Sequence, residues 1–201
     1  MGGVTPLREE DVDPDPLTQF GRWFAEAREA VPVPEQAAVA TATPEGRPSV
    51  RMVLVKGFDG RGFVFHTGYG SRKGRELDAN PYAALLFHWA PLGRQVRIEG
   101  PVERTSRAES EAYFRTRAPL SRVSALASPQ SRVVSGRDEL ERLVDAVHAE
   151  HGDDPPLPEH WGGFRVRPEG WEFWQHRDNR LHDRLRYRRE GGAWIVERLG
   201  P

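Results

Sequence analysis

The sequence predicts one α+β domain, in which helices flank an antiparallel sheet or barrel. Short segments with period-two hydrophobic alternation recur along the chain, turn signals separate them, and capped amphipathic segments interrupt them. A chain of 201 residues is long enough to bury one core. We expect residues 17–201 to form the domain and the polar, proline-rich residues 1–16 to form a flexible N-terminal arm.

The first helix is expected in PLTQFGRWFAEAREA, where Asp15 suits the N-cap and Pro16 the first helical position. Its apolar stripe comprises Leu17, Phe20, Phe24 and Ala27. The period then changes to two in AAVATAT, PSVRMVLVKG and GFVFHTG, with turns at PEGR and FDGRG. YAALLFHW and RQVRIEGPVER follow as further strands, and this succession indicates an antiparallel sheet or barrel.

Two helices are expected in the second half of the chain. Ser106 and Glu109 form a capping-box pattern before AESEAYFRTR. After a predicted loop, APLSRVSALASPQS, a helix begins near Ser135 and continues through RDELERLVDAVHAE. The late strands are expected in GFRVRP, GWEFWQH, NRLHDRLRYRR and AWIVERL.

Composition excludes several classes of function. Lys and Arg number 29 against 30 Asp and Glu, a net charge of -1, so a globally basic nucleic-acid or membrane binder is not indicated and any anion site must be local. The absence of cysteine excludes disulfides, thiolate metal sites and thiol nucleophiles, and we expect no metal. No apolar run approaches about 18 residues and no signal peptide opens the chain, so we expect a cytoplasmic protein.

The stretch GYGSRKGREL predicts an anion site. Ser71 can cap a helix, which places Arg72 and Lys73 in its first turn, where the helix dipole is positive and disfavours cations. A bound phosphate would offset that repulsion and accept hydrogen bonds from the free N–H groups. The alternative is two solvated cations on a surface turn.

Tyr113, Arg117 and Ser121 are spaced four residues apart. If one helix contains all three, they share a face and could bind a second anion. Pro119 argues against a continuous helix, which favours the alternative of a surface arginine beside a half-buried tyrosine.

In NRLHDRLRYRR, basic side chains fall on every second residue. On a strand, Arg180, His182 and Arg184 would share one face and repel one another unless an anion or acidic groups lay opposite. The alternative is a solvated edge strand protected by its charge, and this is the reading we prefer for the last three arginines, Arg186, Arg188 and Arg189.

The chain resembles the pyridoxine (pyridoxamine) 5'-phosphate oxidase family over nearly its whole length after the arm. The resemblance rests on RMVLVKGF, GSRKGRELDANP, RQVRIEGPVE, AYFRTR, PQS, WGGF, EFWQ, RLHDR and ERLGP, in the family's order. It implies an FMN-binding split barrel and a homodimer with two FMN sites at the interface. It also implies oxidation of pyridoxine or pyridoxamine 5'-phosphate to pyridoxal 5'-phosphate, with hydride passing to FMN and O2 reduced to H2O2.

Carried over residue by residue, the resemblance implies three groups of site residues. One subunit would bind FMN through Arg51, Met52, Val53, Leu54, Lys56, His66, Thr67, Arg72 and Lys73, and its partner through Gln95, Gln130, Ser131, Trp174 and Arg184. The substrate phosphate would bind Lys56, Tyr113, Arg117 and Ser121, while Arg180 and His182 would be catalytic and lie against the pyridine ring. Strict alternation puts Arg51 and Lys56 on opposite strand faces, so either a β-bulge or the use of both faces is required.

The departures from the family pattern cluster around the substrate. His66 stands where the family often has an aromatic residue, and Ser124-Ala125-Leu126 replaces a Gly-Ala-Trp-like segment. The family's Arg-Pro is here Arg117-Ala118, with the proline one residue later at Pro119. Two alternatives therefore stay open: a flavin oxidase of phenazine-biosynthesis type with a non-B6 substrate, and a non-catalytic module that binds pyridoxal phosphate or flavin. Nucleic-acid binding is disfavoured because the basic stretch is short.

Overall fold

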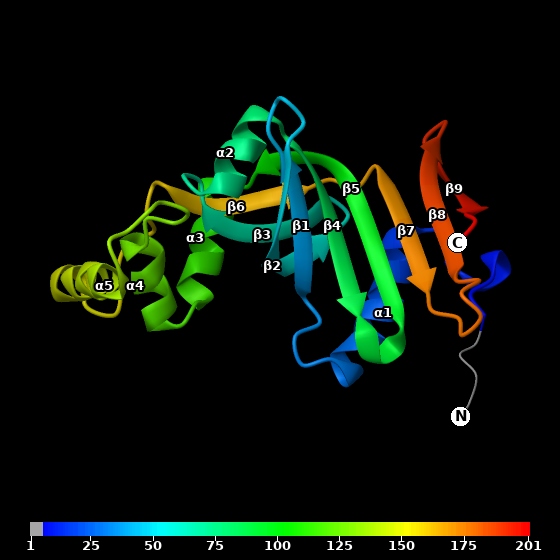
Figure 1. Ribbon diagram of the computed structural model, residues 1–201, viewed down its shortest axis with the longest axis horizontal. Helices are drawn as coiled ribbons and strands as arrows, with labels where there is room; N and C mark the ends of the chain where they lie inside the picture. The colour runs from blue at the N-terminus through cyan, green and yellow to red at the C-terminus, as the bar shows by residue number, and fades with distance from the viewer. Residues whose placement is uncertain (1–5) are drawn as a thin grey trace.

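An antiparallel sheet with the strand order β4-β1-β2-β3-β6-β5-β7-β8-β9 organises the computed structural model, which describes residues 6–201. A further β4–β5 pairing closes the first six strands of this order into a barrel (Figure 1). The strands are β1 (Gln36–Ala42), β2 (Pro48–Asp59), β3 (Gly62–Gly68), β4 (Tyr82–Trp89), β5 (Arg94–Arg104), β6 (Trp161–Val166), β7 (Gly170–Gln175), β8 (Asp183–Glu190) and β9 (Ala193–Arg198). The predicted α+β barrel is confirmed.

Strand β5 joins the barrel to the last three strands. Its residues 94–101 pair with β4 and its residues 94–99 also pair with β7, so β7, β8 and β9 extend the sheet beyond the barrel. We call these three strands the wing. In Figure 1 the wing and helices α3–α5 lie at opposite ends of the molecule.

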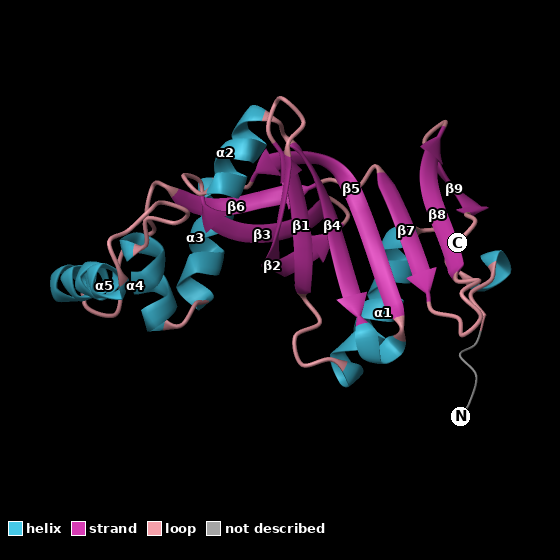
Figure 2. Cartoon of the chain, in the orientation of Figure 1, coloured by secondary structure: helices cyan, strands magenta, loops and turns pink. Residues whose placement is uncertain are grey.

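The helices are α1 (Pro16–Ala30), α2 (Arg72–Ala79), α3 (Arg107–Thr116), α4 (Pro119–Ala127) and α5 (Arg137–His151), with short 3-10 turns η1 (Glu9–Asp11) and η2 (Ala90–Leu92) (Figure 2). Three predicted caps are confirmed. Asp15 accepts from Thr18 N at 3.0 Å, Ser71 accepts from Gly74 N at 3.2 Å, and Ser106 forms the capping box with Glu109. None of these helices, within residues 6–201, is long and apolar enough to cross a membrane.

Two expectations about secondary structure are wrong. The predicted loop 118–131 contains helix α4, because Pro119 stands at its first turn and the residues that follow pack Val123 inward. Strand β8 begins at Asp183, not Asn179, because Arg180 has a left-handed φ of 64° that breaks the alternation. Arg180 and His182 therefore belong to a loop, and they do not alternate with Arg184 on a strand.

Residues 6–15 lie against the wing. Leu7 and Val12 are buried, Leu7 N donates to Asp183, and the Tyr187 hydroxyl donates to the carbonyl of Asp13 at 2.7 Å. Residues 1–5 of the expected arm lie outside the described part of the chain.

Phe20 of α1 occupies the centre of the core. Its ring is fully buried and makes edge contacts with Phe58, Phe63 and Phe87, at centroid distances of 4.9, 4.9 and 5.0 Å. We expect Phe20→Ala to lower the free energy of unfolding by about 3–5 kcal/mol, because it removes these contacts and leaves a cavity. Urea denaturation measures the free energy of unfolding, with Leu120→Ala as a control at an exposed position. A decrease of less than about 1 kcal/mol for Phe20→Ala would contradict the prediction.

Candidate active site

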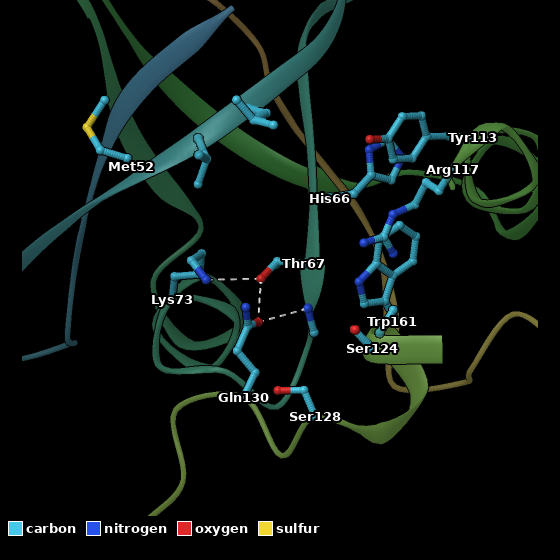
Figure 3. A pocket seen from close by; sticks show the side chains of 14 residues that line it. Met52, His66, Thr67, Lys73, Tyr113, Arg117, Ser124, Ser128, Gln130 and Trp161 are labelled. Carbon is cyan, nitrogen blue, oxygen red and sulfur yellow. Dashed lines mark hydrogen bonds between the residues drawn. The ribbon is translucent and has the colours of Figure 1, made fainter. Parts of the chain in front are cut away.

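A cavity of about 380 Å³ lies between the barrel wall and helices α3 and α4 (Figure 3). Its lining comes from β2, β3, α2, α3, α4, the segment after α4, and β6. The lining residues are Met52, Val53, Leu54, His66, Thr67, Gly68, Lys73, Tyr113, Arg117, Ser124, Ala125, Ser128, Gln130 and Trp161. Nine of these residues are among the predicted site residues, so the fold brings distant segments of the sequence together here.

One end of the cavity is built around the N-terminus of α2. Lys73 lies in the first helical turn, is buried, and donates from Nζ to Thr67 Oγ1 at 3.0 Å. Gln130 Oε1 accepts from Thr67 Oγ1 at 2.8 Å and from Gly68 N at 3.1 Å. Burial, and then the charge of Arg51, lower the pKa of Lys73.

No carboxylate within residues 6–201 pairs with the Lys73 ammonium, whose hydrogen bond to Thr67 leaves two N–H donors for a ligand. Buried charges in proteins are ordinarily paired. A cation at a helix N-terminus, beside a hydroxyl and an amide, is a site that fits a phosphate group. The residues present therefore suit the phosphate of a flavin mononucleotide.

Arg72, the other predicted phosphate ligand, and Arg51, a predicted FMN-binding residue, converge on Glu76 next to Lys73. Arg51 Nη2 lies 3.3 Å from Glu76 Oε2, and Arg72 Nε donates to Oε1 at 2.8 Å. The hydroxyls of Thr41 and Ser49 also donate to Oε2. Neither arginine lines the cavity in the described chain, although both adjoin its phosphate-type end.

Glu76 should make stability depend on pH. Burial would raise its pKa, but the hydrogen bonds from Ser49 and Thr41 and the contact with Arg72 outweigh this and lower the pKa to about 2. Because the folded pKa lies below the ordinary 4.5, the stabilisation is present above pH 4.5 and disappears as the pH falls toward 2. It is on the order of 3 kcal/mol.

We therefore expect Glu76→Gln to lower the free energy of unfolding at neutral pH, with a deficit that shrinks as the pH falls to about 3. Urea denaturation of both proteins across that range measures the difference. A deficit that stayed constant with pH would show that the ionised carboxylate does not carry the effect.

The other end of the cavity is aromatic. The His66 ring stacks on Tyr113 at a centroid distance of 4.0 Å and on Trp161 at 5.4 Å. Burial, followed by the charge of Arg117, lowers the pKa of His66 to about 4, so its ring is neutral at physiological pH.

Arg117 faces the same end. Its guanidinium lies 4.8 Å from the Trp161 centroid, and burial lowers its pKa. Its buried Nη1 has no hydrogen-bond partner within residues 6–201. A half-buried guanidinium with an unsatisfied donor fits an anionic group of a ligand.

Tyr113, Arg117 and Ser121 do not share one helix face, as Pro119 indicated, but Arg117 is half-buried at the cavity and is not the surface arginine that we preferred. Helix α3 ends at Thr116, and Arg117 is its extended C-cap, so the chain turns before α4 begins at Pro119. Tyr113 and Arg117 still meet at the cavity, but Ser124 lines it where Ser121 was expected.

Lys56 lies outside the cavity. The β2–β3 register shifts between Val55 and Gly57, so Lys56 sits at the β-bulge that was one of the two sequence-based alternatives. Its Nζ donates to Glu35 at 2.9 Å. Ser131, which follows Gln130, has a left-handed φ of 67° and also lies outside the lining.

The remaining predicted residues gather on the wing, the adjoining strand β5 and the loop between β7 and β8. Gln95, Trp174 and Arg184 are in register across β5, β7 and β8, and the His182 ring lies 4.6 Å from Trp174. None of them lines the cavity of the same chain. Gln130, which the resemblance assigns to the partner subunit, instead lines its own chain's cavity.

The sequence-based site omitted several residues. Trp161 lies in the quoted WGGF block but received no role, and Ser124 and Ser128 lay in what was expected to be a loop. Glu76 was also omitted. Its position four residues after Arg72 could have predicted their ion pair, since residues with that spacing share a helix face.

Exposed apolar side chains cover one face of the sheet. On β2, Val50, Met52 and Leu54 alternate and are exposed by 68%, 54% and 44%. Across the sheet, Met52 pairs with Ala38, which pairs with Leu86. An apolar strip of this kind suits a protein–protein interface, and it reaches the cavity at Met52 and Leu54.

Comparison with known families and proteins gives a consistent result. Residues 24–151 match the family described as pyridoxamine 5'-phosphate oxidase, and residues 161–201 match the pyridoxine 5'-phosphate oxidase C-terminal dimerisation region. Proteins named pyridoxine/pyridoxamine 5'-phosphate oxidase from Rubrobacter xylanophilus and Burkholderia multivorans are 57% and 56% identical over 197 and 199 residues. Each alignment covers 97% of this chain, and 91% and 93% of the respective relative.

Solved structures share the fold. PhzG from Burkholderia lata 383, in complex with tetrahydrophenazine-1-carboxylic acid, has a TM-score of 0.92 and 35% identity over the full length of both chains. A pyridoxamine 5'-phosphate oxidase-related, FMN binding protein from Nostoc punctiforme has a TM-score of 0.74 at 16% identity, covering 93% of this chain and 98% of its own. On the family matches and the identities to named relatives, this chain belongs to the pyridoxamine 5'-phosphate oxidase family.

Proposed function

We propose that the protein is an FMN-dependent oxidase that converts pyridoxine or pyridoxamine 5'-phosphate to pyridoxal 5'-phosphate and reduces O2 to H2O2. The observation that carries this proposal is that one cavity has two separate cationic ends. Lys73 is buried without a carboxylate partner in the described chain, and Arg117 leaves a buried Nη1 without a hydrogen bond. The reaction requires two anionic ligands side by side, a flavin phosphate and a substrate phosphate.

The Lys73 end holds the flavin phosphate in this proposal. Lys73, Thr67 and the N-terminus of α2 bind it, with Gln130 orienting Thr67, while residues 52–54 of β2 border the cavity. Arg51 and Arg72 hold Glu76 beside this end and add positive potential to it. When bound, FMN supplies the two-electron acceptor that O2 restores, and the chain supplies position and electrostatics.

The Arg117 end holds the substrate phosphate, with Tyr113 beside it and Lys56 and Ser121 as further predicted contacts. Binding of this phosphate positions the reacting carbon of the substrate, which must come within about 3–3.5 Å of the flavin. Arg180 orients the pyridine ring and favours negative charge on it, and His182 hydrogen-bonds the ring oxygen or the reacting substituent.

A homodimer completes the site. In this proposal the residues that do not line their own chain's cavity serve the partner's: Gln95 of β5, Trp174 and Arg184 of the wing, and Arg180 and His182 of the loop between β7 and β8. The apolar strip on β2, β1 and β4 borders the cavity, and the match to the C-terminal dimerisation region spans the wing. Both observations support FMN binding at a subunit interface.

An anaerobic experiment tests the proposal. The purified protein is saturated with FMN, pyridoxine 5'-phosphate is added without oxygen, and the flavin absorbance is followed. We expect the flavin to bleach and to recover its colour when air is admitted. A yellow protein that stays yellow would refute the B6 reaction and keep the flavin site, and a protein that takes up no flavin would refute the whole proposal.

The likeness to PhzG favours one other candidate, a flavin oxidase that acts on an unphosphorylated tricyclic substrate. The Tyr113–Arg117 end favours a phosphorylated substrate instead. Comparing turnover of pyridoxine 5'-phosphate with that of pyridoxine separates the two, because only an enzyme that uses the phosphate discriminates strongly between them. Tight binding of pyridoxal 5'-phosphate without any turnover would instead mark a non-catalytic module.

A further inference from the structure

We propose that Asp183 is a positioning residue, through which N-terminal residues 7–9 and strand β9 fix the loop that carries Arg180 and His182. This inference rests on the proposed function, which gives those two side chains their role at the substrate. Asp183 is the first residue of β8 and directly follows His182. No role was predicted for it from the sequence.

The loop 176–182 contains no helix or strand. Its backbone is held by a turn in which Arg180 N donates to Arg177 O at 3.2 Å, and by Leu181 N donating to Asn179 Oδ1 at 3.1 Å. Arg180 is exposed and adopts a left-handed φ of 64°, which is uncommon for a residue with a side chain. Such a short, exposed loop needs anchors at its ends to keep one conformation.

The loop also determines which nitrogen His182 presents. Arg177 N donates to His182 Nδ1 at 3.1 Å, so this nitrogen acts as an acceptor, and the neutral ring carries its proton on Nε2. Trp174 packs against the ring at a centroid distance of 4.6 Å. While the loop keeps this conformation, His182 offers an N–H donor from Nε2.

Asp183 ties the two ends of this loop together. Its Oδ2 lies 3.8 Å from Arg177 Nε, at the residue whose backbone N–H binds His182. The same carboxylate accepts from Leu7 N at 3.1 Å and from Arg198 Nη1 at 2.9 Å. With its side chain only 14% exposed, Asp183 connects the loop to two elements that lie outside it.

Arg198 of β9 completes the connection to the N-terminal segment. Its Nε and Nη2 donate to the two carboxylate oxygens of Glu9 at 2.9 and 2.8 Å, and Nη2 also donates to Leu7 O at 2.8 Å. One planar guanidinium thus grips Asp183, Glu9 and Leu7 in a fixed geometry. Among residues 6–201, this carboxylate and guanidinium join residues 7–9 to the end of the loop.

The first test is Asp183→Asn, which keeps the size of the side chain and removes its charge. We expect kcat for pyridoxine 5'-phosphate to fall at least tenfold, with KM and FMN affinity within about twofold of wild type, because the phosphate-binding residues lie on other elements. Asp183→Glu, which keeps the charge, should recover part of the loss. Asp178→Asn, a fully exposed carboxylate in the same loop, is the matched control and should behave as wild type.

The second test observes His182 directly. Two-bond ¹H–¹⁵N spectra of histidine-labelled protein, with His182 assigned from a His182→Gln spectrum, should show one Nε2–H tautomer in wild type and a mixture in Asp183→Asn. Glu9→Gln should shift the same signal more weakly, whereas Glu10→Gln, which removes a carboxylate that pairs with Arg8 and not with Arg198, should leave it unchanged.

Either of two results would overturn the proposal. The first is that Asp183→Asn keeps the wild-type kcat and the wild-type His182 tautomer. The second is that its kcat falls only in proportion to a loss of folded, FMN-loaded protein. If the wild-type protein turned over no B6 substrate, the proposed function would fail. The tautomer spectra would still show whether Asp183 positions His182.

Discussion

Lys73→Met is expected to lower the affinity of the protein for FMN about 100-fold. The ammonium is buried, donates to Thr67, and has no carboxylate partner in the described chain, so a ligand phosphate is the anion that fits it. Hydrogen bonds to charged groups contribute about 1.5–3 kcal/mol each, and a 100-fold change corresponds to about 2.7 kcal/mol. Titration of the apoprotein, followed by quenching of FMN fluorescence, measures this affinity.

A matched control is available on the same helix. Arg75 is an exposed cation two residues after Lys73, and Arg75→Met should leave FMN affinity unchanged. The thermal midpoint of Lys73→Met apoprotein should be equal to or higher than that of wild type, because the substitution removes a buried charge that lacks a counter-ion. Lys73→Met protein that bound FMN within threefold of wild type would contradict the assignment of this end of the cavity.

The parts of the fold that the sequence predicted are those in which local chemistry and long-range packing agree. Strands β4 and β5 match the predicted segments residue for residue, because alternate side chains enter the barrel and a turn separates the two segments. The caps at Asp15, Ser71 and Ser106 are local hydrogen bonds, so the residues near each cap are enough to predict them.

The errors arose where a sequence pattern does not determine the backbone. Alternation of Arg180, His182 and Arg184 is present in the sequence, but the left-handed φ of Arg180 shows that a loop can carry the same alternation. We preferred a surface arginine at position 117 because Pro119 disfavours a continuous helix, whereas Arg117 is half-buried and meets Tyr113 at the cavity although the helix ends between them. The role of Asp183 depends on contacts with residues 7 and 198, which no local pattern reveals.

Arg117→Met is expected to lower kcat/KM for pyridoxine 5'-phosphate about 100-fold and to leave the weaker turnover of unphosphorylated pyridoxine within about threefold. The guanidinium is half-buried against Trp161 with an unsatisfied Nη1, so its loss removes charge-assisted hydrogen bonds from a poorly solvated phosphate. Losing one partner of such a desolvated charge pair costs about 2–5 kcal/mol. Steady-state turnover of both substrates, measured as H2O2 production, gives the ratio of kcat/KM for pyridoxine 5'-phosphate to kcat/KM for pyridoxine.

Two further variants show whether the guanidinium itself carries that discrimination. Arg117→Lys keeps the charge but loses the planar fork that lies over Trp161, so it should recover only part of the ratio. Arg115→Met removes an exposed cation of α3 that pairs with Glu111 and Asp154, and it should retain the wild-type ratio. Equal losses for both substrates in Arg117→Met would mean that Arg117 shapes the cavity without reading the phosphate. That outcome would favour an unphosphorylated substrate, because the aromatic stack of Tyr113, His66 and Trp161 would then be the principal recognition surface at this end.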